Sequence, residues 1–290
     1  MGTDIKTKTK LRRINVKKIT KAVKKLFIDA NTVLDEDVIG ALRHALSREE
    51  SETGKQVLQK IIDNAAVARR KKMPICQDTG LAVVFVELGQ DVHIIGGELH
   101  AAIEEGVRQA YMDGYLRKSV CDPLTRKNTT DNLPAIIHVD MVAGDRMKII
   151  AMPKGGGSEN SSAAKMLTPA AGIDGIKKFV LDTVDSAGAN PCPPVIVGVG
   201  IGGSLEQACV MAKKALLRPV GAANRIDLRV EQMEKELLEG INKLGIGPAG
   251  LGGRVTALAV NVEMMPCHIA SLPVAVNIQC HVARHKEITI

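Results

Sequence analysis

The sequence predicts a mixed α/β fold (mixed α+β), in which an N-terminal helical subdomain packs on an α/β core with mixed sheets. Before residue 72, apolar residues recur at the spacing of amphipathic helices. After residue 73, short aliphatic runs that suit buried strands alternate with helical patterns. Hydrophobic residues make up 45% of the chain and aromatic residues only 2%, so we expect an aliphatic core. We therefore divide a single domain over residues 1–290 into a helical part, 1–72, and an α/β part, 73–290.

Three helices are expected in the helical part. The lysine-rich stretch 6–25 has no acidic residue, which would suit a nucleic-acid-binding arm or a transit peptide, but its apolar face favours a solvated amphipathic helix. Acidic residues at 35–37 suit the positive end of a second helix. Ser51 or Thr53 can cap the third helix, which has a basic end at 69–72.

The turn after this region combines unusual residue types. Cys76, Gln77 and Asp78 lie between Pro74, which fixes a backbone angle, and Gly80, which permits a tight turn. A thiol, an amide and a carboxylate on a rigid loop suit a functional site. An equally compatible interpretation is a helix-to-strand connector with a buried cysteine, because cysteine often behaves as a small hydrophobe.

Two hairpins are expected in the α/β part. Strand 82–88 would pair with residues 93–95 across a short polar turn, and strand 135–142 would pair with 147–152. We expect helices over 161–165 and 172–184 as well.

A further helix is expected from Glu98 to about Arg117. Arg117 would then complement the negative end of the helix dipole, or it could bind an anionic ligand.

Two glycine-rich stretches are candidate binding loops. Residues 154–160 include Lys154, Gly156 and Gly157, whose cation and consecutive N–H groups would suit an anion, although a flexible loop is a serious alternative. Residues Gly198–Gly203 follow a strand and precede a helix, which resembles a dinucleotide fingerprint with the wrong glycine spacing. A nucleotide-binding protein therefore remains an alternative of another functional class.

Three of the six cysteines share a setting that suits metal ligands. Cys76, Cys192 and Cys280 each stand at a turn or strand end beside proline or polar residues, whereas Cys209 has the helical spacing of a core residue. Cys267 competes on local grounds. The spacings match neither a zinc finger nor a ferredoxin, so only the fold could bring three of them together.

The overall charge and the N-terminus restrict the setting of the protein. The net charge of +7 is compatible with nucleic acid or with small anionic substrates and does not decide between them. We find no signal-peptide pattern and no apolar run suited to a membrane helix, so a reducing cytoplasm is expected.

Four motifs resemble those of the iron–sulfur-dependent (class I) fumarate hydratases, and they occur in family order over nearly the whole chain. They are Pro74–Gly80, Lys154–Asn160, Gly188–Pro194 with its glycine-rich continuation, and Val255–His281. In this family three cysteines hold a 4Fe–4S cluster, and the motifs put Cys76, Cys192 and Cys280 in that role. One iron then keeps an open position and can act as a Lewis acid.

The resemblance also implies the substrate-binding and catalytic residues. Gln77, Asp78, Arg117, Gly156 and Gly157 would contact a small dicarboxylate. His268 and Asp78 would form a hydrogen-bonded acid–base pair near the leaving oxygen. Without the resemblance, His268 would be interpreted as a core histidine.

The resemblance further implies a second chain. Single-chain members of the family continue beyond the segment that ends here at Ile290, and two-subunit members divide at this point. The chain therefore resembles the alpha subunit of a fumarase that interconverts fumarate and (S)-malate, and it would need a beta subunit for full activity. An alpha dimer within a heterotetramer is expected, without nucleic acid or membrane as a partner. The L-tartrate dehydratases are divided in the same way and are the alternative.

Overall fold

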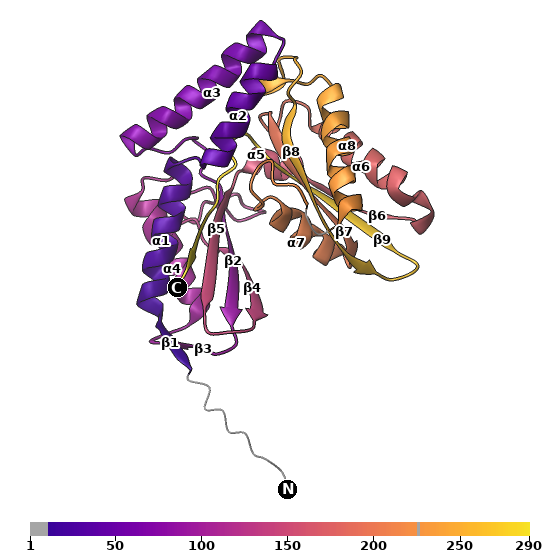
Figure 1. Cartoon of the computed structure of the whole chain (residues 1–290). Coiled ribbons are helices and arrows are strands. Elements are labelled where there is room, and N and C mark those ends of the chain that lie inside the picture. The colour runs from indigo at the N-terminus through magenta and orange to yellow at the C-terminus, as the bar shows by residue number, and fades with distance from the viewer. Residues whose placement is uncertain (1–10, 225–226) are drawn as a thin grey trace. The chain divides into compact units, whose positions relative to one another are not determined.

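The computed structural model describes residues 11–224 and 227–290 and divides the chain into two units (Figure 1). Unit 1 takes the residues up to Thr32, then Cys76–Pro153 and Arg284–Ile290. Unit 2 takes Val33–Ile75 and Lys154–Ala283. Both contain helices and strands, so the predicted mixed α/β fold is confirmed.

Unit 1 is built on a four-stranded sheet with strand order β10-β5-β2-β4. Helices α1 and α4 pack against each other and against one face of this sheet in an aliphatic core. A parallel two-stranded sheet, β1-β3, stands apart from it. The elements are β1 (Arg12–Asn15), α1 (Val16–Thr32), β2 (Leu81–Gly89), β3 (Val92–Ile95), α4 (Leu99–Asp113), β4 (Ile136–Val142), β5 (Met147–Lys154) and β10 (Lys286–Thr289).

Both expected hairpins are wrong. Strands β2 and β3 belong to different sheets, and β2 lies between β4 and β5. At the end of β2 the backbone forms hydrogen bonds with the segment between β4 and β5 and not with β3. The Gly89 N–H donates to the Arg146 carbonyl, and the Gln90 N–H donates to the Val142 carbonyl. Residues 82–86 of β2 are all buried, and a strand this apolar is stable at the centre of a sheet, with a neighbour on each side.

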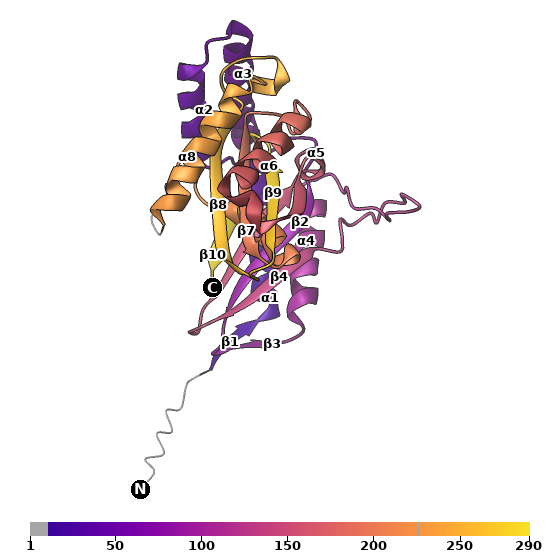
Figure 2. The same ribbon diagram turned by 90° about the vertical axis from the view of Figure 1, so that its right-hand side faces the viewer.

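Unit 2 is built on a sheet with strand order β6-β9-β7-β8. Helices α6 and α8 cover one face, the one toward the viewer in Figure 2, and α7 packs on the other. Strand β7 runs parallel to β8 and antiparallel to β9. The elements are α2 (Glu36–Arg48), α3 (Glu52–Lys71), α5 (Gly156–Asn160), β6 (Ala163–Leu167), α6 (Gly172–Ala187), β7 (Val195–Gly203), α7 (Leu205–Ala215), α8 (Leu228–Lys243), β8 (Ala257–Cys267) and β9 (Leu272–Gln279), with short 3-10 turns at Pro169–Ala171 and Pro248–Gly250.

The three N-terminal helices are present, but they are divided between the units. Helix α1 belongs to unit 1, whereas α2 and α3 belong to unit 2. Ser51 caps α3, because its hydroxyl accepts the Gly54 N–H at 3.2 Å. The part of 6–25 that lies outside the described residues is 6–10.

Two further expectations are corrected. The expected helix over 161–165 is instead strand β6, which pairs antiparallel with β9 and so satisfies its backbone groups there. Helix α4 ends at Asp113, so Arg117 lies in the following loop and does not complement the helix dipole.

The glycines of Gly198–Gly203 all lie inside β7, where they allow close packing. A Cβ atom on Gly198 would lie 2.1 Å from the Ala212 carbonyl oxygen, and one on Gly200 would lie 2.0 Å from that of Ala208. Helix α7 therefore packs directly on the strand backbone, and this stretch does not form a phosphate-binding turn. The nucleotide-binding alternative loses the site on which it depended.

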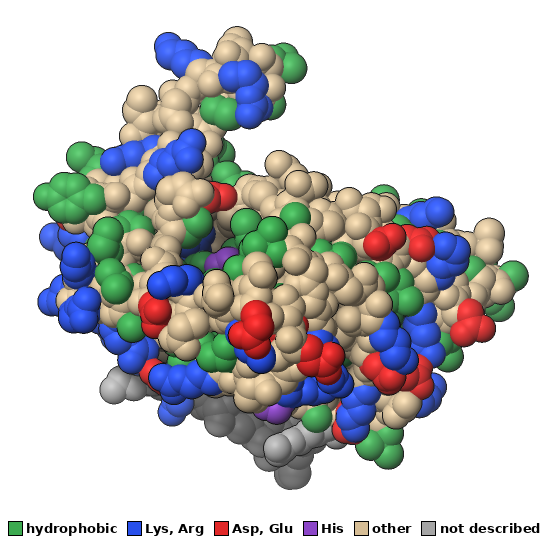
Figure 3. Space-filling model, turned by 90° about the horizontal axis from the view of Figure 1, so that it is seen from above, with side chains coloured by type: hydrophobic (Ala, Val, Ile, Leu, Met, Phe, Trp, Pro, Cys, Tyr) green, Lys and Arg blue, Asp and Glu red, His purple; other side chains and the backbone are tan. Residues whose placement is uncertain are grey.

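The surface has mixed charge. On the face shown in Figure 3, Lys and Arg side chains are interspersed with Asp, Glu and hydrophobic side chains. Among the described residues, no helix is both long enough and apolar enough to span a membrane.

Candidate active site

The turn that carries Cys76 is held by its own polar groups in unit 1. The Cys76 Sγ accepts the Asp78 N–H at 3.4 Å, and the Asp78 Oδ1 accepts the Gly80 N–H at 3.0 Å. The Thr79 hydroxyl donates to the Arg117 carbonyl at 2.8 Å, which places the backbone of Arg117 beside this turn. These hydrogen bonds fix the positions of the Cys76 sulfur and the Asp78 carboxylate within the turn.

Three buried side chains support the turn from unit 1. The Tyr111 hydroxyl lies 2.8 Å from the carbonyls of both Thr79 and Gly80, and burial raises the pKa of Tyr111, which keeps it a neutral donor. Asn132 Nδ2 donates to the Gly80 carbonyl at 3.2 Å. Arg284 donates one Nη2 hydrogen bond to the Asp78 carbonyl.

Arg284 still has hydrogen-bonding capacity. Its side chain is buried, with the residue 3% exposed, yet its Nε and Nη1 have no hydrogen-bond partner among the described residues. A buried guanidinium without an anion is costly, so these atoms suit a carboxylate or a phosphate.

Three motifs come together in unit 2. A Cβ atom on Gly157 would lie 3.3 Å from the Asn190 carbonyl oxygen, so the glycine-rich turn lies against the loop that carries Cys192. Cys192 has a φ of 53°, which is strained for a residue with a side chain. Its carbonyl lies 2.8 Å from the Nδ1 of His281, the residue after Cys280. The loops of Cys192 and Cys280 are thus adjacent.

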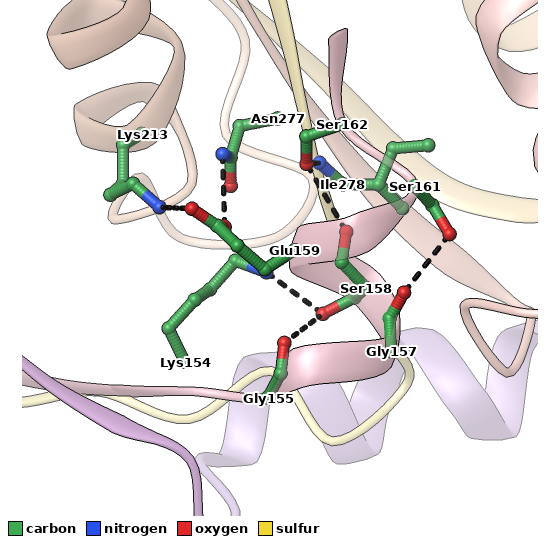
Figure 4. Close-up of polar contacts among 10 residues, drawn as sticks. All are labelled: Lys154, Gly155, Gly157, Ser158, Glu159, Ser161, Ser162, Lys213, Asn277 and Ile278. Carbon is green, nitrogen blue, oxygen red and sulfur yellow. Dashed lines mark hydrogen bonds and ion pairs between the residues drawn. The ribbon is translucent and has the colours of Figure 1, made fainter. Parts of the chain in front are cut away.

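A charged network lies beside this point (Figure 4). Glu159 accepts from Lys213 Nζ at 2.6 Å, from Asn277 Nδ2 at 3.2 Å, and pairs with Lys154 Nζ at 3.2 Å. Lys154 also donates to the Ser158 hydroxyl at 2.8 Å. The network ties the glycine-rich turn to α7 and to β9, the strand that leads to Cys280.

The two main charges of the network have shifted pKa values. Burial of the fully buried Lys154 lowers its pKa to about 8, opposed by the nearby carboxylate of Glu159 and, to a smaller extent, by the thiol of Cys280. Burial raises the pKa of Glu159, but Lys154 and Lys213 lower it by more, so the net shift is downward. At neutral pH Glu159 is therefore ionised, and two lysines surround it.

His268 lies at the other end of β9 from Cys280. It stands in the exposed turn between β8 and β9, where its Nδ1 accepts the Ala270 N–H at 3.2 Å. Cys280 follows the last residue of β9. The structure therefore does not bring His268 to the point where Cys192 and Cys280 meet.

The cysteines are the side chains of this chain that could hold an iron–sulfur cluster. The six cysteines, all within the described residues, form no disulfide. No three His, Cys, Asp or Glu side chains are grouped as a metal site in residues 11–224 and 227–290. Nevertheless, the adjacent Cys192 and Cys280 loops and the backbone N–H donor toward the Cys76 sulfur suit thiolate ligands. Thiols are the side chains that hold iron–sulfur clusters, so the chemistry of these three residues, one in unit 1 and two in unit 2, fits such a group.

Several residues of the site were missed from the sequence. Glu159 belongs to a motif that the sequence singled out, so its position beside Lys154 was a usable signal. His281 was visible only as a neighbour of Cys280. No signal in the sequence identifies Arg284, because its role depends on being buried beside a turn more than two hundred residues earlier.

Comparison with known proteins gives consistent matches. A family model described as fumarate hydratase (Fumerase) matches residues 20–289. A Methanocaldococcus jannaschii protein named "Putative L(+)-tartrate dehydratase subunit alpha" is 48% identical over 271 residues, which cover 91% of this chain and 94% of that protein. The L(+)-tartrate dehydratase subunit alpha of Escherichia coli K12 is 32% identical over 279 residues, or 95% of this chain and 91% of that protein.

Proposed function

Because the chain belongs to the fumarate hydratase family, we propose that it is the alpha subunit of a hydro-lyase that interconverts fumarate and (S)-malate. The family match over residues 20–289 supports the reaction class. The second candidate is L(+)-tartrate as substrate, and the names of the similar alpha subunits favour it specifically. (S)-Malate and L(+)-tartrate are both small dicarboxylates with a hydroxyl next to a carboxylate, so one type of site could be adapted to either.

Cys76, Cys192 and Cys280 would hold a 4Fe–4S cluster. The observation that carries this proposal is the meeting of the glycine-rich turn, the Cys192 loop and the Cys280 strand end in unit 2. When bound, the cluster supplies an iron with an open coordination position that acts as a Lewis acid toward the substrate hydroxyl. The buried Lys154 would add positive charge beside Cys280, which favours an anionic ligand set.

The dicarboxylate would be bound by cations and by N–H groups. Arg117, Gln77 and Asp78 come from unit 1, and Gly156 and Gly157 offer backbone N–H groups in unit 2. We add Arg284 to this group, since its Nε and Nη1 both have N–H groups that remain to be donated to an anion such as a carboxylate.

Proton transfer would use Asp78 and His268. The Oδ1 of Asp78 is held by the Gly80 N–H, and Asp78 lies two residues from Cys76. A carboxylate held in this way could orient a histidine ring and stabilise its protonated form. The base that takes the carbon-bound proton is assigned to a separate beta subunit. The names of the similar alpha subunits support such a partner, and we place an alpha dimer and two beta chains in a cytoplasmic heterotetramer.

The test is turnover by the alpha chain, reconstituted anaerobically with iron and sulfide, with and without a co-expressed beta chain. We expect brown alpha chains with about four irons each and near-zero activity alone. Addition of the beta chain should restore turnover, and parallel assays with (S)-malate and L(+)-tartrate identify the substrate. Enzyme-like turnover by the alpha chain alone would refute the need for a beta subunit, and absence of bound iron would refute the cluster.

A further inference from the structure

A hollow of about 400 Å³ lies within unit 2, between α2, α8 and the start of β8. Helix α2 contacts β8, and α8 packs along the same strand (Figure 1). The volume is in the range of small-molecule sites in proteins. None of the residues proposed to bind the cluster or the dicarboxylate lines this hollow. It is therefore a candidate site for another ligand.

One stripe of α2 forms a wall of the hollow, and small residues on it leave the space open. Asp37, Ala41, His44 and Arg48 are three or four residues apart, so they lie along one face of the helix. Gly40 lines the hollow as well. A Cβ atom on Gly40 would meet no heavy atom within 4 Å outside its own stretch of helix. The space beside α2 is therefore unfilled.

The facing wall is mainly apolar. Leu238 of α8 lines it, together with Val255, Ala257 and Leu258 at and just before the start of β8. The amide of Asn242 lies on this wall too, but its Oδ1 already accepts two backbone N–H groups at 2.8 and 2.9 Å, and its Nδ2 donates to the Ala257 carbonyl at 3.3 Å. Water gains few hydrogen bonds against such a wall, so a hydrocarbon body is favoured there.

Basic side chains line one end of the hollow. Arg48 ends α2, His44 stands one turn before it, and Arg254 lies in the loop before β8. The side chains of His44 and Arg48 have no hydrogen-bond or ion-pair partner among residues 11–224 and 227–290. Arg254 pairs with Glu50 through its Nη1, which leaves further guanidinium N–H groups for a ligand. An anion is therefore favoured at this end.

The other end of the hollow carries a carboxylate. Asp37 stands in the first turn of α2, about 16 Å along the helix axis from Arg48 at a rise of about 1.5 Å per residue. Its Oδ2 accepts the Val220 N–H at 2.8 Å. A second negative charge on a ligand would be repelled at this end. A ligand with a single anionic end is therefore favoured over a dianion.

From this arrangement we propose that the hollow binds a small monoanion with an elongated apolar body, whose carboxylate pairs with Arg48 and Arg254. The apolar body lies along Ala41, Leu238 and Leu258 toward the Asp37 end. (S)-Malate and L(+)-tartrate do not match this site, because they are compact dianions without an apolar part. The inference goes beyond the proposed function and does not rest on it, since it concerns a second ligand of the same chain.

Calorimetric titration of the full-length chain with 4-(4-biphenylyl)butyrate tests the proposal, and the neutral primary amide of this acid is the matched control ligand. At the efficiency typical of drug-sized ligands, its roughly 18 non-hydrogen atoms correspond to a dissociation constant of about 0.1 mM. The amide should bind about 10-fold more weakly or worse, because the two arginines lose their charged partner. Equal affinity for acid and amide, or displacement of the acid by (S)-malate, would overturn the proposal.

Two variants of α2 locate the bound probe. Gly40→Leu fills the hollow and should weaken binding about 10-fold or more, without loss of thermal stability, because leucine is a better helix former than glycine. Arg48→Gln removes one cation and should weaken binding roughly 5-fold. The matched control is Arg43→Gln, because Arg43 is exposed on the same helix and does not line the hollow. Unchanged affinity in Gly40→Leu, or equal losses in Arg48→Gln and Arg43→Gln, would refute the site.

The same titration of the assembled holoenzyme separates a ligand site from a contact between subunits. We expect the affinity for the probe to be the same as in the isolated chain. Loss of binding on assembly would show that a neighbouring subunit covers the hollow, and the proposal would then be wrong. These measurements use neither turnover nor bound iron, so they succeed or fail independently of the proposed hydro-lyase function.

Discussion

The two ends of β9 differ in almost every physical respect. At the Gln279 end the strand is buried, and Glu159, Asn277 and His281 connect it to three neighbouring segments. At the Leu272 end, residues 264–272 form the β8–β9 tip, which is largely exposed and has no charged side chain. Its two ends pair with β7 and β6, and short-range hydrogen bonds hold the turn at His268. The strand thus joins a buried end, linked to its neighbours by polar side chains, to an exposed turn.

Under the proposed function, this difference separates residues that would hold the cofactor from residues that would meet the substrate. Polar groups at the Gln279 end are fixed by buried ion pairs, as ligand positions require. His268 is held by hydrogen bonds within its own turn and not by ion pairs with other described residues. Substitutions at the two ends should therefore have different signatures.

The largest difference is expected between cysteines. Cys192→Ser or Cys280→Ser should lose most of the bound iron and nearly all activity, because a thiolate ligand is removed. Cys267→Ser, at the end of β8, should keep both, although only the following turn and β9 separate it from Cys280 in the sequence. Iron and sulfide analysis after anaerobic reconstitution measures this. Cluster loss in Cys267→Ser with retention in Cys280→Ser would reverse the ligand assignment.

The two histidines form the next pair. His268→Asn should lower kcat by roughly 10²-fold with full iron content, since a proton donor is lost. His281→Asn should instead weaken iron retention, because the Cys192 carbonyl loses its partner at 2.8 Å. Parallel measurement of kcat and of iron per chain distinguishes them, and equal iron loss in both variants would contradict the separation.

Glu159→Gln should reduce stability. The substitution leaves two lysines facing each other, which we expect to lower the free energy of unfolding by roughly 2–3 kcal/mol. This is less than for a fully buried pair, because the Glu159 side chain is 35% exposed. Urea unfolding of the apoprotein at pH 7 measures it, with Glu239→Gln, which breaks an exposed pair with Lys243, as a control near zero.

The effect of Glu159 should depend on pH with a defined sign. Its pKa in the folded protein is below the ordinary 4.5, so the folded state favours the carboxylate. The stabilisation is complete above the unfolded pKa and is lost as the pH falls through the lower folded pKa. The difference between wild type and Glu159→Gln should therefore be constant from pH 7 to about 5 and shrink below 4.5. A difference that grows on acidification would contradict this account.

The smallest effects are expected from two serines. Ser162→Ala removes the acceptor of the buried Ile278 N–H, at 3.0 Å, and should lower the free energy of unfolding by about 1–2 kcal/mol. Ser271→Ala removes an exposed bond to the His268 carbonyl that water can replace, so we expect a change within about 0.5 kcal/mol. Thermal unfolding of the two variants side by side gives the comparison, and a larger loss at Ser271 would show that the tip is not independent of the core.

The sequence by itself determined the elements whose signals are local. The third helix was predictable from its apolar spacing and the Ser51 cap, and the strand over 82–88 from its aliphatic run. The resemblance of four motifs was sufficient to predict the family, because those motifs are contiguous stretches of sequence.

Only the tertiary structure decided the strand partners and the place of His268. Pairing depends on which strand is most buried, so β2 separates the expected hairpin of β4 and β5. Gly200 resembled a glycine of a nucleotide-binding turn, but glycine is needed there because the backbone of α7 packs directly against β7. His268 and Cys280 are twelve residues apart in a motif that suggests proximity, yet an extended strand gains about 3.3 Å per residue and carries them to opposite ends of a sheet. Arg284 became a candidate anion-binding residue only in the folded structure, where its side chain is buried. Burial removes the water that solvates the guanidinium, so a partner of opposite charge becomes favourable.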